Sequence, residues 1–222
     1  MILTLAGENY LNTLLKDEHG RALYRIDTPY RLFGGGRTTV TRLTGQTDHD
    51  IAWIEWNMLS PDEFHQHGRT VEASQHLPHK GFFGTCVSSF SRRDDVLIES
   101  RKRVLVASDG QSYVWKDGSH GVKVNHTAVP TCPAVVCSAD PSPPNPRQLD
   151  CDDAALSRVA EYHTRSLGFF SKGHPAYLEI AADGVPILDD IVASFVYMEK
   201  KRQQRKRSRA SAAAGASASA GA

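Results

Sequence analysis

The sequence predicts a mainly β protein in which many short antiparallel strands form a closed barrel around one hydrophobic helix near the C-terminus. Two observations lead to this fold class. Short segments in which apolar and polar residues alternate, the pattern of strands, follow one another along most of the chain. Residues 187–203 instead favour a helix that is apolar on every side, and such a helix is buried on every side.

A barrel is the economical way for strands to surround a helix. The helix is about 10 Å across, whereas side chains already fill the interior of a barrel of about eight strands, so more strands are needed. Closure would also remove the exposed strand edges. A helix packed between a sheet and a long loop is the alternative that these patterns leave open.

Strands are predicted first at residues 22–27, 37–43 and 50–56. The first alternates between an apolar and a mixed face, and Thr28-Pro29 ends it. The second is rich in β-branched residues, and the third is apolar on both faces, as expected of a strand that is covered on both sides.

The second half of the chain continues the series. Residues 103–118 contain two apolar runs joined by Ser108-Asp109-Gly110, and an Asp-Gly pair between such runs is a strong hairpin signal. Further strands are predicted at residues 121–126, 159–164 and 176–181.

Two long loops interrupt the strands, near residues 58–80 and 128–153. The first is polar and rich in histidine, and the second carries prolines, which cannot donate to a strand ladder. Neither has the composition of a separate domain. We therefore expect one domain at residues 1–205, followed at 206–222 by a disordered tail that is basic and then rich in Ala, Ser and Gly.

The helix at 187–203 also has the charges of a helix at its two ends. Asp189 and Asp190 fall in its first turn, near the positive end of the helix dipole, and basic residues from Lys200 onward lie near its negative end. Between them, Ser194 is the one polar residue in an apolar run.

The chain is predicted to be intracellular. Its first twenty residues lack the basic and apolar regions of a secretory signal, and no apolar run approaches the roughly 20 residues of a membrane span. Its 4 cysteines are too few for a disulfide scaffold in 222 residues. We expect a cytoplasmic location, with the nucleus or a membrane surface as places to which the basic residues could direct it.

The strongest functional signal is a basic cluster where the helix ends. Residues 200–209 hold 7 Lys or Arg and no acid, so the remaining chain has a net charge of 1 − 7 = −6. The candidate residues for lipid or partner binding are Lys200, Lys201, Arg202, Arg205, Lys206 and Arg207, with Arg101, Lys102 and Arg103 as a second set that the fold could bring close.

Other chemical patterns favour no catalytic residue, metal or cofactor. The histidines of residues 65–79 match no zinc spacing, and Cys132 and Cys137 are too far apart for a redox pair. Cys86 and a distant histidine fit a catalytic pair in composition only. The Gly-rich residues 34–37 precede a strand and lack the Lys-Ser/Thr of a phosphate-binding loop.

Three segments resemble a fungal family of unknown function that is similar to the Tubby, LURP-one-related and phospholipid-scramblase-like superfamily. They are the run from Asp17 to Ile26, the strand Tyr113-x-Trp115-Lys116, and the helix that begins Ile187-Leu188-Asp189-Asp190 and ends Tyr197-Met198-Glu199-Lys200. The resemblance covers about residues 5–205. It implies a barrel of about twelve strands threaded by a hydrophobic helix.

The resemblance also suggests partners. Tubby-like domains are associated with phosphoinositides and scramblase-like domains with membranes, although no motif here carries over a lipid-binding residue. We therefore expect a non-enzymatic domain that binds an anionic phospholipid or phosphoinositide, or a protein partner, through its basic residues. The alternative is a nuclear adaptor that uses them as an import signal, with a nucleic-acid contact as the weaker form of that alternative.

Overall fold

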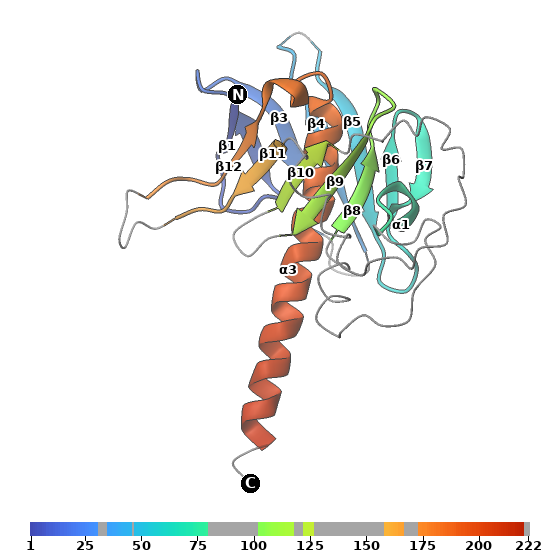
Figure 1. Ribbon diagram of the computed structural model, residues 1–222, viewed down its shortest axis with the longest axis vertical. Helices are drawn as coiled ribbons and strands as arrows, with labels where there is room; N and C mark the ends of the chain where they lie inside the picture. Colours follow the sequence, from blue (N-terminus) through green and yellow to red (C-terminus); the bar gives the residue numbers. More distant parts are fainter. Residues whose placement is uncertain are drawn as a thin grey trace, which may run out of the picture.

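The computed structural model describes residues 1–30, 35–45, 47–79, 102–117, 122–126, 158–166 and 173–219. Its strands form a 12-stranded antiparallel sheet in the order β7-β6-β5-β4-β3-β2-β1-β12-β11-β10-β9-β8 (Figure 1). The strands are β1 (Ile2–Leu5), β2 (Thr13–Lys16), β3 (Ala22–Asp27), β4 (Gly36–Arg42), β5 (His49–Trp56), β6 (Glu63–Gln66), β7 (Arg69–Glu72), β8 (Lys102–Val106), β9 (Ser112–Asp117), β10 (Val122–His126), β11 (Arg158–His163) and β12 (Tyr177–Ile180).

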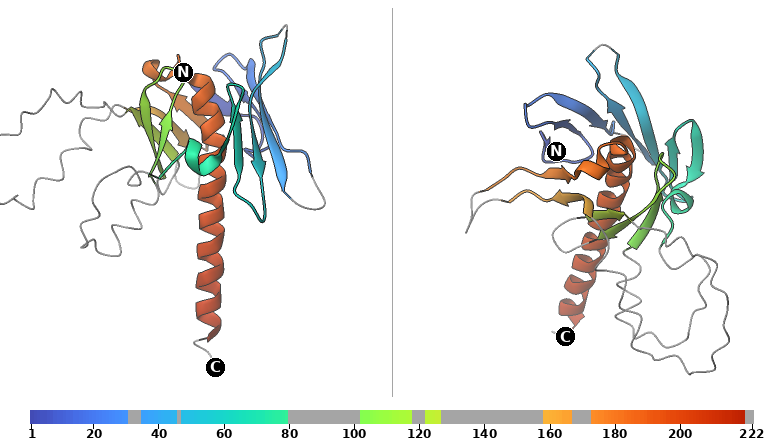
Figure 2. Two further views of the ribbon diagram at one scale, coloured as in Figure 1. Left: turned by 90° about the vertical axis from the view of Figure 1, so that its right-hand side faces the viewer. Right: turned by 45° about the horizontal axis from the view of Figure 1, so that its top comes forward.

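The sheet curves around the first half of the long helix α3 (Leu188–Ser219), as Figure 2 shows from two further directions. Ile191 and Phe195 are 0% exposed and Met198 is 1% exposed. Aromatic residues pack against the helix from the surrounding strands, and the ring of Tyr162 lies 4.7 Å from that of Phe195. The prediction of a helix walled in by the protein's own strands is therefore confirmed.

The barrel is not closed, which corrects the prediction of closure. In the described part of the chain no ladder joins β7 to β8, the two ends of the sheet. The short helix α1 (Ala73–His76) and the residues after it lie at this seam instead. Val104 N donates to the Pro78 carbonyl over 2.9 Å, and His79 forms an isolated bridge with Arg103. A helical turn offers no strand edge for a ladder, so the seam is bridged only locally.

The predicted loop at residues 58–80 is wrong, because it contains β6, β7 and α1. Gln66 pairs with Arg69 across a two-residue turn in which His67 and Gly68 have positive φ angles of 52° and 71°. Tight hairpins need this conformation, and Asn-Gly or Asp-Gly is its usual signal. With His in the first position, the turn was not recognisable. The second predicted loop, 128–153, lies outside the described residues.

The helix continues past its predicted end at residue 203 and ends at Ser219. Residues 206–219, which were predicted to belong to a disordered tail, lie in α3 instead, and the Arg, Lys and Ala of this segment favour a helix. Residues 206–211 are exposed, and this part of α3 projects from the barrel (Figure 1). Before α3, the short helix η1 (Ala182–Gly184) leads out of β12.

Candidate functional site

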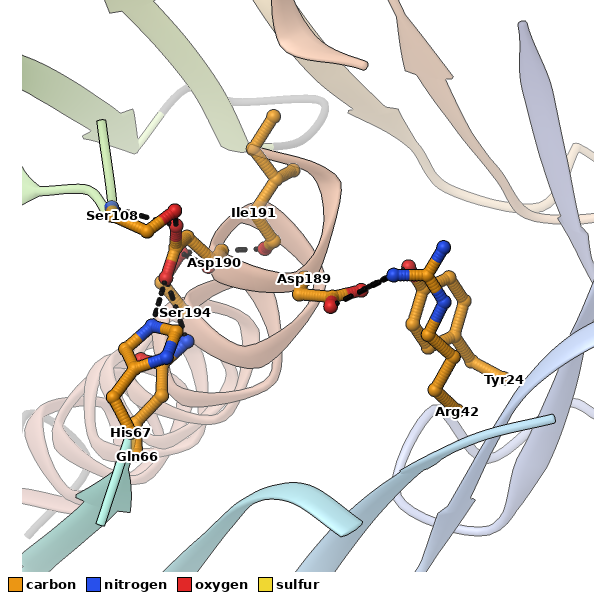
Figure 3. Close-up of polar contacts among 9 residues, drawn as sticks. All are labelled: Tyr24, Arg42, Gln66, His67, Ser108, Asp189, Asp190, Ile191 and Ser194. Carbon is orange, nitrogen blue, oxygen red and sulfur yellow. Dashed lines mark hydrogen bonds and ion pairs between the residues drawn. The ribbon is translucent and has the colours of Figure 1, made fainter. Parts of the chain in front are cut away.

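The two ends of the barrel differ in chemistry. At the end where α3 begins, Asp190 is 2% exposed and accepts four hydrogen bonds (Figure 3). One carboxylate oxygen binds Gln66 Nε2 at 2.8 Å and His67 Nε2 at 2.9 Å. The other accepts from the backbone N of Ser108 at 2.9 Å and from its hydroxyl at 2.6 Å. Asp190 thus joins the helix to two hairpin turns.

Asp189 joins the same end of α3 to two more strands. The Tyr24 hydroxyl donates to its carboxylate over 2.5 Å, and Arg42 Nη1 lies 3.0 and 3.1 Å from the two carboxylate oxygens (Figure 3). Burial, together with the hydrogen bond to Asp189, holds the pKa of Tyr24 well above its usual range. Because these polar groups already bind one another, this end is a structural anchor.

The opposite end, which we call the helix-exit end, carries the predicted basic residues. Lys200 Nζ lies 3.6 Å from the centre of the Trp56 ring, and burial lowers the pKa of this lysine to about 8. Lys201 Nζ lies 2.8 Å from Asp62 Oδ2. These two lysines therefore contact the last residue of β5 and the last residue of the connection between β5 and β6.

Two of the predicted arginines are engaged in ion pairs inside the fold. The Arg202 side chain is 3% exposed, and its Nε and Nη2 bind Glu199 at 2.6 and 2.7 Å. Its Nη1 has no hydrogen-bond partner among the described residues. Arg205 binds Asp117 on β9 through Nη2 at 2.7 Å. Neither guanidinium is displayed freely on the surface.

The remaining basic residues fall into two groups. Lys206, Arg207 and Arg209 are exposed on the projecting part of α3. In the second set, Arg101 lies outside the described residues, Lys102 is half-buried on β8, and Arg103 is 8% exposed. The fold does bring Arg103 to the first set, because Arg103 and Lys201 lie over the same Tyr197 ring, at 5.3 and 5.4 Å.

Large apolar side chains are exposed at the helix-exit end. Met58 is 78% and Leu59 102% exposed, and both lie in the β5–β6 turn (residues 57–62). Tyr30, 87% exposed, follows β3, and Gly36 at the start of the next strand, β4, pairs with Trp56. Sequence reasoning missed these residues. The sequence feature that could have indicated them is a pair of large apolar residues directly before Ser60-Pro61, in a segment that belongs to no strand.

A cavity of about 1050 Å³ lies beside the exit of α3. Its lining includes Arg202, Glu199 and Gln203 from the helix, Tyr162 from β11 and Arg165 beyond it. Arg165 is paired with Glu8, and Arg202 with Glu199, so these lining charges balance.

The histidines of residues 65–79 take part in packing and hydrogen bonds. His65 stacks on Trp53 with ring centres 4.6 Å apart, and His76 stacks on Phe64 at 4.2 Å. His67 binds Asp190, and His79 Nε2 lies 3.0 Å from Arg103 Nη2. Each side chain therefore has a structural contact that accounts for its position.

A different cluster brings Glu161, His163 and Glu179 together, with ligand atoms within 4.8 Å of one another. Glu161 is already bound by Lys123 at 2.7 Å and by Arg158 at 2.6 Å. A metal ion would have to displace these two cations, so the arrangement is that of a cross-strand salt-bridge network.

Comparison with known proteins places the chain in a family. None of the helices in the described residues combines the length and the apolar character that crossing a bilayer requires. No curated protein and no solved structure matches the chain. Residues 8–204, which include strands β2 to β12, the anchor of α3 and the first residues of the helix-exit end, match DUF6593. The chain therefore belongs to DUF6593, a family of unknown function.

Proposed function

We propose that this protein is a non-enzymatic domain that binds an anionic membrane surface peripherally, through its helix-exit end. The observation that carries the proposal is that two kinds of exposed side chain lie at the same end of the molecule. Lys206, Arg207 and Arg209 are exposed cations on α3, and Met58 and Leu59 are exposed apolar residues on the β5–β6 turn.

The magnitudes favour a reversible contact. A basic residue near an anionic leaflet contributes about 1 kcal/mol, so three exposed cations contribute at most on the order of 3 kcal/mol, which is weak on its own. Salt screens such contacts over about 10 Å. Apolar contacts are not screened, and the two kinds of side chain together give a stronger association than either alone.

The resemblance of the chain to the Tubby, LURP-one-related and scramblase-like superfamily supports a membrane ligand. Anionic phospholipids, including phosphoinositides, carry the charge that exposed cations attract. Arg202 and Arg205 contribute less to this attraction, because they are paired with acids inside the fold.

A nuclear role is the second candidate, because the exposed run Lys206, Arg207 and Arg209 is also the type of sequence that import receptors bind. A protein that recognises basic helices would use the same residues. Neither of these partners needs the exposed Met58 and Leu59, which is why the membrane is preferred.

Co-sedimentation with vesicles tests the proposal. We expect binding to vesicles of phosphatidylcholine with phosphatidylserine, no binding to phosphatidylcholine alone, and weaker binding as salt rises. The triple variant K206S/R207S/R209S removes only exposed charges, so it should fold normally and lose most of the binding. Equal binding of this variant would contradict the role of the tail. The same variant can be expressed in cells as a fluorescent fusion. If the fusion is lost from the nucleus, the result favours the nuclear role instead.

A further inference from the structure

We propose that the β5–β6 turn is the element of the helix-exit end that enters the bilayer, with Met58 and Leu59 inserted between lipid headgroups. Because this turn belongs to the surface described above, its role rests on the proposed function. It adds to that function a depth of insertion and an orientation of the domain, which cations alone do not determine.

The exposure of this pair is unusual in its local context. Single exposed apolar residues are common on protein surfaces, but here two adjacent large side chains, Met58 at 78% and Leu59 at 102% exposed, lie together at the tip of a turn. Tyr30, at 87% exposed, follows β3 at the same end of the barrel. Large apolar side chains at the edge of a domain are of the kind that insert into the interface of a bilayer.

Contacts at the base of the turn fix its conformation. Asn57 N donates to Asp62 Oδ1 over 3.0 Å, and Asn57 Nδ2 donates to the Pro61 carbonyl over 2.8 Å. Asp62 in turn binds Lys201 Nζ and, through its carbonyl, Ala73 N at 2.8 Å. These contacts fix both ends of the turn to the barrel and to α3. The backbone of the turn therefore loses little conformational entropy when Met58 and Leu59 enter a bilayer.

Cations flank the turn on one face of α3. Lys200 lies against Trp56, directly before the turn. At about 100° per residue, Arg207 lies within about 20° of Lys200 around the helix, whereas Arg209 lies about 180° away. By backbone position, Arg207 therefore lies on the same face of α3 as Lys200, and Arg209 lies on the opposite face.

This arrangement determines how the domain meets a membrane. Since α3 projects past the barrel (Figure 1), a flat bilayer that touches both the turn and the helix must lie oblique to the helix axis. Lys200 and Arg207 then face the anionic headgroups, and Met58 and Leu59 reach the boundary between headgroups and acyl chains. Arg209 faces solvent in this orientation.

Insertion is tested on the full chain with M58S/L59S and a matched control. The control, V106S/V185S, replaces two residues that are 60% and 48% exposed at the other end of the barrel, near Ser108 and the start of α3. On vesicles of phosphatidylcholine and phosphatidylserine, we expect M58S/L59S to bind about tenfold more weakly than the wild type. The control should bind as the wild type does.

Tryptophan fluorescence gives a second readout, because Trp56 lies two residues before Met58. Brominated phospholipids should quench the wild-type emission and should quench M58S/L59S less. If the wild type binds with full salt sensitivity but shows neither quenching nor a loss on M58S/L59S, insertion is wrong while the proposed function stands. If the wild type does not bind the vesicles, both are wrong.

Orientation is tested by two single variants on the same vesicles. Arg207→Ser should weaken binding several-fold more than Arg209→Ser, although both remove one exposed charge from α3. Equal losses would show that the tail contributes only its total charge and would overturn the oblique orientation.

Discussion

The indole N–H of Trp115 donates a hydrogen bond of 3.0 Å to the hydroxyl of Ser194, in the middle of the buried part of α3. Both residues are 0% exposed. The hydroxyl in turn donates to the Asp190 carbonyl one turn earlier, at 2.6 Å. The single polar residue in the apolar run of the helix is therefore the partner that allows a tryptophan to be buried against it.

This contact predicts the effect of removing the hydroxyl. Ser194→Ala leaves the Trp115 N–H buried without a partner, which costs about 1–3 kcal/mol in the free energy of unfolding. Urea denaturation of the variant measures this loss. Trp115→Phe in the Ser194→Ala background removes the orphaned donor, so the losses of the two single variants should not add. Simple additivity would contradict the contact.

The acids at the start of α3 should differ in their contribution to stability. In Asp190→Asn, one of the two oxygens becomes an NH₂ group that faces two donors, so we expect a loss of about 2–3 kcal/mol. In Asp189→Asn the amide oxygen can still accept from Tyr24, and the lost ion pair with the half-exposed Arg42 is worth about 1 kcal/mol or less. Thermal or urea denaturation of both variants measures the difference, and equal losses would contradict the anchoring role of Asp190.

Most of the architecture could be predicted from the sequence because it depends on local periodicity. The strand at residues 22–27 was placed correctly from alternation alone, and the buried helix from its apolar circumference. The hairpin of β6 and β7 was missed because His67 takes a conformation for which His is an uncommon signal. The open seam was missed because a sheet's closure depends on pairing between segments far apart in the chain.

The candidate site was less predictable for the same reason. A cluster of basic residues is visible in the sequence, but their pairing with Asp62 and Asp117 depends on the fold. The sequence counts Arg202 as a surface cation, whereas the structure buries it against Glu199. The end of β5 at Trp56 was predicted correctly, but the sequence showed no strand after it, so Met58 and Leu59 were counted as part of a long loop and not as the exposed residues of a tight turn to β6.

The low pKa of Lys200 predicts a titration near neutral pH. Burial is the main cause of the shift to about 8, and the nearby charge of Asp62 opposes it. Lysine side-chain NMR should therefore show this resonance titrating about two units below an ordinary lysine. Asp62→Asn should lower the pKa further, since it removes the opposing charge. A midpoint near 10.5 would contradict the burial of the ammonium group.

The same shift has a defined sign for stability. The unfolded lysine has a pKa of 10.5, so between about pH 8 and 10.5 the unfolded chain binds more protons than the folded one. The contribution of Lys200 to stability therefore rises with pH across this window. Lys200→Met keeps the apolar stem over Trp56 without the charge, so it should flatten this part of the pH profile. An unchanged profile in the variant would assign the rise to another group.

Glu199 and Arg202 form the ion pair whose disruption should cost the most. Their side chains are 1% and 3% exposed, so Glu199→Gln leaves a buried guanidinium without its counter-charge, and a loss of about 3–5 kcal/mol is expected. Arg205→Ala breaks a pair that is less buried, with side chains 30% and 10% exposed for Arg205 and Asp117, so it should cost less than Glu199→Gln. Replacing both members, as in E199L/R202M, removes the uncompensated charge and should restore most of the stability lost in Glu199→Gln. Urea denaturation of the three variants measures this order; if E199L/R202M is no more stable than Glu199→Gln, the loss comes from packing and not from the buried charge.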